Sequence, residues 1–137
     1  MGAISPQGRI LALCIAQLPD RTIPRHSWAA EVLVEQLWMA CDRSTNGDLQ
    51  EALSPLVDGR GVHARRVRSE MWELARAGLL EAKGVGGCAS FAVPRGAEAD
   101  LSCRRMLTAD DILAIERAAA QLTARLLALS KAARASV

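Results

Sequence analysis

Arginines are concentrated in one segment of this 137-residue chain. Residues 60–76 contain five arginines and only two glutamates. A guanidinium group can donate two parallel hydrogen bonds to a phosphate or to a guanine edge, so clustered arginines indicate nucleic-acid binding. The chain has 17 lysines and arginines and 15 aspartates and glutamates, a net charge of +2, so the indication comes from where the charge lies. The five residues are Arg60, Arg65, Arg66, Arg68 and Arg76.

Residues that could carry catalysis or bind a metal are sparse. The cysteines Cys14, Cys41, Cys88 and Cys103 include no C-x-x-C pair, and this spacing matches no common zinc site. The two histidines are far apart in sequence, and segment 84–87 lacks the glycine spacing of a phosphate-binding loop. The sequence therefore predicts buried or inert thiols, no metal, no other cofactor, and a protein that is not an enzyme.

Helices are expected to hold the arginines in place, in one domain spanning residues 1–137. Half of the residues are hydrophobic and only 3% are aromatic, and the abundant alanine and leucine favour helices. Within the N-terminal segment 5–41, Ser5 and Pro6 open a first helix, and Ser27 can cap a second at about 28–41. That second helix is apolar nearly all round, which is typical of a helix in the middle of a structure or in an interface.

A short helix is predicted at about 48–56 and a longer one at about 63–77. Thr45 and Asp48 have the spacing of a capping box for the short helix. In the longer helix Val67, Met71 and Leu74 fall at helical spacing and should face the core, and Gly78 suits its C-terminal end. Segments 80–83 and 88–93 flank a glycine-rich tip and are predicted to form a β-hairpin.

A long final helix is predicted over 108–134, opened by a capping box of Thr108 and Asp111. Its apolar residues alternate steps of three and four, as in a coiled-coil seam, and favour a two-fold dimer. In the alternative reading, the same seam packs within the chain on Trp28, Val34 and Trp38. The predicted dimerisation residues are Ile112, Ile115, Leu122, Leu126 and Leu129.

Three fragments resemble the winged helix-turn-helix superfamily of bacterial transcription regulators. They are GDLQEAL (47–53), RVRSEMWELARAGLLEA (66–82) and KGVGGCASFAV (83–93). The layout is similar to that of MarR-type and PadR-type regulators. The resemblance implies a mainly α (α+β) fold with a winged helix-turn-helix core at 45–94, a two-stranded wing, and N- and C-terminal helices that form a dimerisation layer.

One departure from that pattern lies between Leu53 and Arg66, where twelve residues replace the usual tight turn. Either the short helix is extended through Val57, or the turn carries an inserted loop. The inward stripe of the longer helix keeps its register in both cases, so its outer face stays available to a major groove. The predicted DNA-binding residues are Arg60 and His63 in the turn, Arg65, Arg66, Arg68 and Ser69 on the helix, and Lys83 at the base of the wing.

The sequence is thus interpreted as a dimeric, double-stranded-DNA-binding repressor or regulator in the cytoplasm. The alternatives are a winged-helix protein-interaction adaptor and a plasmid or phage factor for partition or copy control. The longest apolar stretch near the start, 10–18, is too short to span a membrane. Control by a small-molecule effector or by oxidation of Cys88 or Cys103 stays open. Trp28, Trp38, Met39 and Cys41 are expected to be core residues, with the lining of an effector pocket as their alternative role.

Overall fold

The computed structural model describes residues 5–24, 28–84, 90–96 and 107–135, which form a mostly helical α+β structure as expected. Two antiparallel sheets accompany the helices, one with strand order β1-β5-β4 and one formed by β2 and β3. The helices are α1 (Pro6–Ala16), α2 (Ala29–Ala40), α3 (Gly47–Leu53), α4 (Ala64–Arg76) and α5 (Ala109–Ala135), and the strands are β1 (Thr22–Ile23), β2 (Val57–Asp58), β3 (Gly61–Val62), β4 (Glu81–Lys83) and β5 (Ser90–Ala92).

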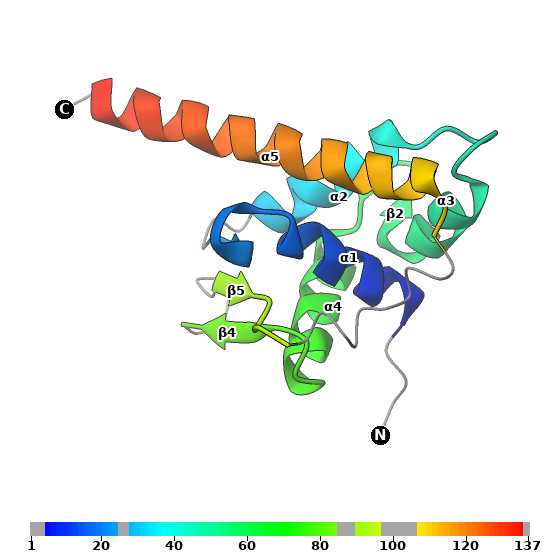
Figure 1. Ribbon diagram of the computed structural model, residues 1–137, viewed down its shortest axis with the longest axis horizontal. Helices are drawn as coiled ribbons and strands as arrows, with labels where there is room; N and C mark the ends of the chain where they lie inside the picture. The colour runs from blue at the N-terminus through cyan, green and yellow to red at the C-terminus, as the bar shows by residue number, and fades with distance from the viewer. Residues whose placement is uncertain (1–4, 25–27, 85–89, 97–106, 136–137) are drawn as a thin grey trace.

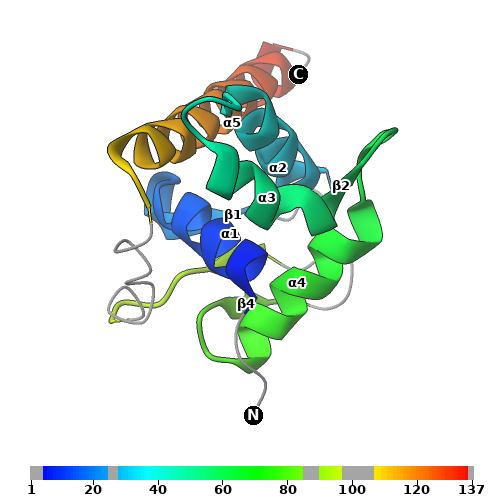
Figure 2. The same ribbon diagram turned by 90° about the vertical axis from the view of Figure 1, so that its right-hand side faces the viewer.

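Helix α5 lies along one side of the molecule, and α4 with the β4–β5 hairpin lies on the far side of α1 (Figure 1). The same order, from α5 through α1 to α4, is visible after a quarter turn (Figure 2). The core between these layers is aliphatic: Leu11, Ile15, Leu33, Leu37 and Leu122 are all less than 2% exposed. Because α5 packs mainly on α2, the two helices form one layer and α4 belongs to the other.

The caps of α1 and α5 confirm their predicted starts. The Ser5 hydroxyl accepts a hydrogen bond from the Gly8 amide at 3.1 Å, with Pro6 at the first helical position. At α5 the Thr108 hydroxyl accepts from the Asp111 amide at 3.1 Å, and the Asp111 carboxylate accepts from the Thr108 amide at 3.1 Å. Side chains thereby satisfy amide groups that the helix itself leaves unpaired. Ser27, predicted to cap the second helix, lies outside the described residues.

The capping box predicted at Thr45 and Asp48 is wrong, because α3 begins at Gly47 with Asn46 as its N-cap. Asn46 is 4% exposed, and its side chain does not cap α3 but bonds to one neighbour within the same turn and to one distant residue. Its Nδ2 donates to Asp111 Oδ1 at 2.8 Å, and its Oδ1 accepts from the Asp42 amide at 2.9 Å. Asn46 therefore joins the turn before α3 to the first turn of α5.

Helix α4 has the predicted register, with Val67, Met71 and Leu74 at most 2% exposed. Its predicted end is also confirmed: Gly78 has a φ of 80°, and the Leu79 amide donates to the Leu74 carbonyl at 3.0 Å. A positive φ is a conformation that glycine adopts at little cost, so the chain reverses here into β4.

The β4–β5 hairpin is present, and a strand that the sequence did not predict joins it. Strand β1 pairs with β5 so that Thr22 lies opposite Ala92 and Ile23 opposite Phe91. The Val93 amide extends this pairing by donating to the Arg21 carbonyl at 2.9 Å. The segment between α1 and α2 therefore supports the inner strand of the hairpin.

The extra residues before α4 form a second small hairpin, so the inserted-loop reading is the one that holds. Helix α3 ends at Leu53 and passes through a 3₁₀ turn at Ser54–Leu56 into β2 and β3. Asp58 pairs with Gly61, which leaves Gly59 and Arg60 at the tip. Figure 2 shows this hairpin projecting from the body beside the start of α4.

Two of the four residues expected in the core are on the surface. Trp38 is 37% exposed and Met39 is 69% exposed. Trp28 and Cys41 are half-buried and pack against the core. The apolar residues of α2 are therefore only partly covered within the chain.

The seam of α5 is mostly used within the chain, as in the alternative reading. Ile115 and Leu122 are 4% and 0% exposed, so these two predicted dimerisation residues belong to the core. Ile112 and Leu126 are half-buried, and Leu129 is 46% exposed. The body of the molecule is shorter than α5, which projects beyond it at its C-terminal end (Figure 1). No helix among the described residues is long and apolar enough to cross a bilayer.

Candidate nucleic-acid interface

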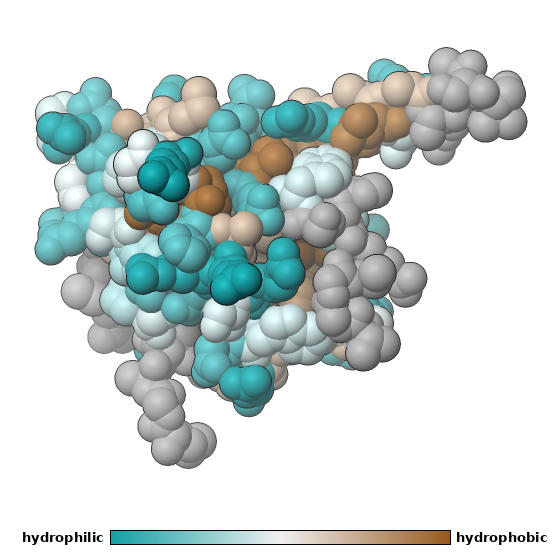
Figure 3. Space-filling view, turned by 180° about the vertical axis from the view of Figure 1, so that it is seen from behind, coloured by the Kyte–Doolittle hydropathy of each residue, from teal (hydrophilic) through white to brown (hydrophobic). Residues whose placement is uncertain are grey.

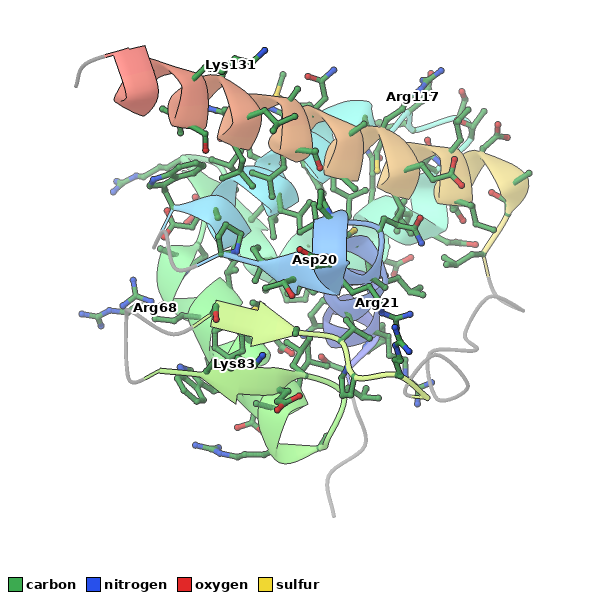
Figure 4. The ribbon with its side chains drawn as sticks, turned by 60° about the vertical axis from the view of Figure 1, so that its left-hand side comes forward. Asp20, Arg21, Arg68, Lys83, Arg117 and Lys131 are labelled. Carbon is green, nitrogen blue, oxygen red and sulfur yellow. The ribbon has the colours of Figure 1, made fainter. Side chains whose placement is uncertain are left out.

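Helix α4 separates its apolar and basic residues onto opposite faces. With Val67, Met71 and Leu74 turned inward, Arg65, Arg68 and Ser69 are exposed, as predicted. Figure 4 shows Arg68 pointing away from the body of the molecule. Seen from behind, hydrophilic residues gather over the middle of the molecule (Figure 3). Neither Arg65 nor Arg68 forms an ion pair with any residue that the structure describes.

Glu70 does not neutralise these arginines, because its carboxylate is turned toward α1. It accepts hydrogen bonds from the Ser5 hydroxyl at 2.7 Å and from Gln7 Nε2 at 3.0 Å. Helix α1 approaches so closely that a Cβ on Gly8 would lie 3.0 Å from Glu70 Oε2 and 3.3 Å from Leu74 Cδ2. The first turn of α1 therefore sets the position of α4. The sequence pattern did not predict this contact between the two helices.

An aromatic pair joins the β4–β5 hairpin to α4. Trp72 on α4 and Phe91 on β5 have ring centroids 5.1 Å apart at an interplanar angle of 79°. This edge-to-face geometry is a favourable arrangement of two aromatic rings. Helix and hairpin are thus joined through side chains as well as through the turn at Gly78.

Two further arginines of α4 have partners within the protein. Arg66 Nη1 donates to the Pro55 carbonyl at 3.0 Å and so ties the start of α4 to the 3₁₀ turn before it. Arg76 forms an ion pair with Glu73 at 2.7 Å, and both side chains are largely exposed. Exposed pairs of this kind contribute little to stability. Arg66 therefore has a structural contact alongside its predicted role, and Arg76 lies at the far end of the helix.

The remaining predicted residues lie at the two ends of α4. Arg60 is exposed at the tip of the β2–β3 hairpin, where its amide donates to Asp58 Oδ1 at 2.7 Å. His63 is the half-buried N-cap residue of α4 and makes no side-chain cap. Lys83 is exposed at the end of β4, opposite Ser90 (Figure 4). The structure thus brings the predicted residues to one helix and to the hairpins before and after it.

The described thiols are poor candidates for sensing oxidants. Burial raises the pKa of Cys14 well above its ordinary value, and the nearby Cys41 raises it further. Burial, followed by the Asp111 carboxylate, raises the pKa of Cys41 to about 11. The thiolate is the reactive form, so both groups are protonated and unreactive at neutral pH. Cys88 and Cys103, the two predicted sensors, lie outside the described residues.

A small cavity lies between α1 and the start of α5, with a volume of about 140 Å³. Small-molecule sites in proteins usually measure about 300–1,000 Å³, so this cavity is smaller than such sites. None of Trp28, Trp38, Met39 and Cys41 lines it, and an effector pocket at those residues stays a prediction. Within the described ranges, no three His, Cys, Asp or Glu side chains are grouped as metal ligands. The cavity is lined by Leu13, Gln17, Leu107, Ile112, Ile115 and Glu116.

Comparison of the chain with protein-family models, with curated proteins and with solved structures gives no match. The geometry of α4 and its two flanking hairpins is therefore the basis for inferring function.

Proposed function

We propose that this protein is a winged helix-turn-helix regulator of transcription that binds duplex DNA through α4. The observation that carries the proposal is the exposed face of Arg65, Arg68 and Ser69, which is backed by an apolar stripe and bordered by the β4–β5 hairpin. A helix held in this way can enter a major groove, which is wide enough to admit one α-helix. In the proposed reading, α3 and α4 are the helix-turn-helix and β4–β5 is the wing.

The charge around the start of α4 suits a polyanion. The first turn of α4 contains no acidic residue, and its N-cap residue provides no side-chain acceptor. Helix N-termini attract phosphate through unpaired amide groups, and the nearby arginines add to that attraction. Arg65 and Arg68 can then donate paired hydrogen bonds to guanine or to phosphate.

The flanking hairpins extend the interface along the DNA backbone. Arg60 lies at the tip of one hairpin before α4, and Lys83 lies on the other hairpin after it. Contacts to phosphate orient a protein on DNA without reading sequence, which suits single basic side chains at the edges of a surface. By covering a promoter in the cytoplasm, such a protein acts most simply as a repressor; a partition or copy-control factor would bind DNA in the same way.

Binding to duplex DNA at two salt concentrations tests the proposal. We expect affinity for random duplex to fall steeply with salt, because each neutralised phosphate releases counterions. Arg65→Ala and Arg68→Ala should each weaken binding to a selected site by about 1–3 kcal/mol. Arg76→Ala, at the far end of α4 and paired with Glu73, is the matched control and should bind normally.

Normal binding by both variants would reject the proposed face. Absence of binding to random duplex and to selected genomic fragments at low salt would favour the second candidate, a protein-interaction adaptor. That candidate rests on the exposed side chains of Trp38 and Met39 on α2, which a protein partner could cover.

A further inference from the structure

The β2–β3 hairpin is tied to the start of α4 by two hydrogen bonds. The His63 amide, at the N-cap of α4, donates to the Leu56 carbonyl at 2.7 Å and closes the base of the hairpin. Arg66 Nη1 donates to the Pro55 carbonyl at 3.0 Å, one residue further back. Both acceptors belong to the 3₁₀ turn Ser54–Leu56, which leads into β2. The position of the hairpin is therefore fixed relative to α4.

One basic side chain extends from the tip of this hairpin. Asp58 and Gly61 are paired, so Gly59 and Arg60 form the loop between the strands. The Asp58 carboxylate accepts from the Arg60 amide at 2.7 Å and thereby shapes the turn. The Arg60 side chain is exposed and forms no ion pair with any residue that the structure describes. The tip therefore presents one guanidinium group to solvent.

The fold does not require glycine at position 59. Gly61 has a φ of 125°, a conformation that favours glycine, but Gly59 is not among the residues with a positive φ. A Cβ on Gly59 would meet nothing within 4 Å. Glycine at such a position lowers stability, because it gives the unfolded chain more conformational freedom. Nothing among the described residues therefore accounts for it, whereas a bare main chain does permit close approach to a ligand.

We propose that the hairpin tip lies against the sugar-phosphate backbone of DNA, at the edge of the groove that α4 enters. Gly59 is the point of closest approach, and Arg60 binds a phosphate at that point through its guanidinium group. This inference rests on the proposed binding of DNA by α4. It adds Gly59, which the sequence did not predict, to the interface.

The length of the hairpin fits this contact. Arg60 lies three residues before the N-cap residue His63, and a chain of that length spans at most about 10 Å. The major groove is about 12 Å wide, so the phosphates at its edges lie about 6 Å from its centre. The tip is therefore long enough to reach these phosphates, and Figure 2 shows it projecting from the body beside the start of α4.

Gly59→Ala separates the DNA contact from folding. We expect the variant to be at least as stable as the wild type in urea denaturation, because its Cβ meets nothing within the chain. In fluorescence polarisation with a labelled random-sequence duplex, it should bind about threefold or more weakly, since its side chain displaces the phosphate. Gly59→Leu should bind more weakly still.

Gly47→Ala is the matched control for this substitution. A Cβ on Gly47 also meets nothing within 4 Å, and its φ is not positive. Gly47 follows Asn46, which is bonded to α5 on the side of the molecule away from α4. This variant should therefore bind DNA as tightly as the wild type.

Arg60→Ala tests the nature of the contact. Loss of one phosphate contact should reduce the slope of log affinity against log salt concentration by about 1. The loss of affinity should be uniform across duplex sequences, because phosphate contacts carry no sequence information. The full chain is used throughout, and circular dichroism checks that each variant is folded.

Wild-type affinity in Gly59→Ala would overturn the inference. So would destabilisation of this variant, or a loss in Arg60→Ala that is confined to particular base sequences. Binding that depends on Arg68 but not on Gly59 or Arg60 would overturn this inference alone. Failure of the wild-type chain to bind duplex DNA would overturn the proposed function, and this inference with it.

Discussion

At the scale of single residues, Asn46 and Asp111 form a polar contact inside an otherwise aliphatic core. Asp111 is 2% exposed, and its two oxygens accept hydrogen bonds from Asn46 Nδ2 and from the Thr108 amide. Buried polar groups are stable only when they are hydrogen-bonded, and losing one partner leaves the other desolvated. This contact therefore specifies how the turn before α3 meets the start of α5.

We predict that Asn46→Ala lowers the free energy of unfolding by about 2–3 kcal/mol, because it removes a partner of the buried carboxylate and an acceptor for the Asp42 amide. Arg43→Ala is the matched control, since Arg43 is exposed in the same turn, and it should change stability by less than about 0.5 kcal/mol. Urea denaturation measures both. A larger loss in Arg43→Ala than in Asn46→Ala would contradict this assignment.

At the scale of elements, the contact between α1 and α4 decides where the basic face lies. The carboxylate of Glu70 accepts from Ser5 and Gln7 in the first turn of α1, and Gly8 allows the two helices to approach. A carboxylate at a helix N-terminus is favoured by the helix dipole. Helix α4 is thus fixed from its buried side, which leaves its arginines on the outer side.

Two glycine substitutions separate this packing effect from helix propensity. Propensity alone predicts that replacing a helical glycine by alanine is stabilising by about 0.5–1 kcal/mol. We expect that gain for Gly47→Ala in α3, where an added Cβ meets nothing within 4 Å. Gly8→Ala should instead lower stability by about 1–2 kcal/mol, because its Cβ would press on the Glu70 carboxylate and on Leu74. Thermal or urea denaturation gives the sign, and stabilisation by Gly8→Ala would show that the contact is soft.

The helices could be predicted from the sequence because each is long enough to show its period. Helices α1, α2, α4 and α5 begin and end within a few residues of their predicted bounds. The two-residue strands β1, β2 and β3 could not be predicted, since two residues show no alternation and their pairing depends on distant parts of the chain. Asn46 was missed for the same reason, because its partner Asp111 is 65 residues away.

At the scale of the whole molecule, only part of the candidate interface was accessible to sequence reasoning. The outer face of α4 follows from its inward stripe, which is a local pattern. The position of Arg60 depends on the β2–β3 hairpin and the contact of Arg66 depends on Pro55, and neither is local to α4. The largest difference between the prediction and the structure is that the apolar seam of α5 packs within its own chain. The sequence could not decide this, because a seam of this spacing is equally suited to packing within a chain and between chains.

If the chain is a dimer, as its sequence predicts, it binds a site with two-fold symmetry. We expect genomic fragments selected with the purified protein to share an inverted repeat, with half-sites about 34 Å apart or a multiple of that distance. Selected fragments without any symmetry would argue against a dimer on DNA, while still supporting binding by α4.

The pairing of β1 with β5 also affects the solubility of the folded chain. Because β5 is the central strand, β1 and β4 are the edge strands of the described sheet, and β4 is the longer of the two. Open edges invite strands from neighbouring molecules, and charged side chains on them discourage that addition. Glu81 and Lys83 are exposed at the two ends of β4, so the fold itself carries a protection against edge-to-edge aggregation at high concentration.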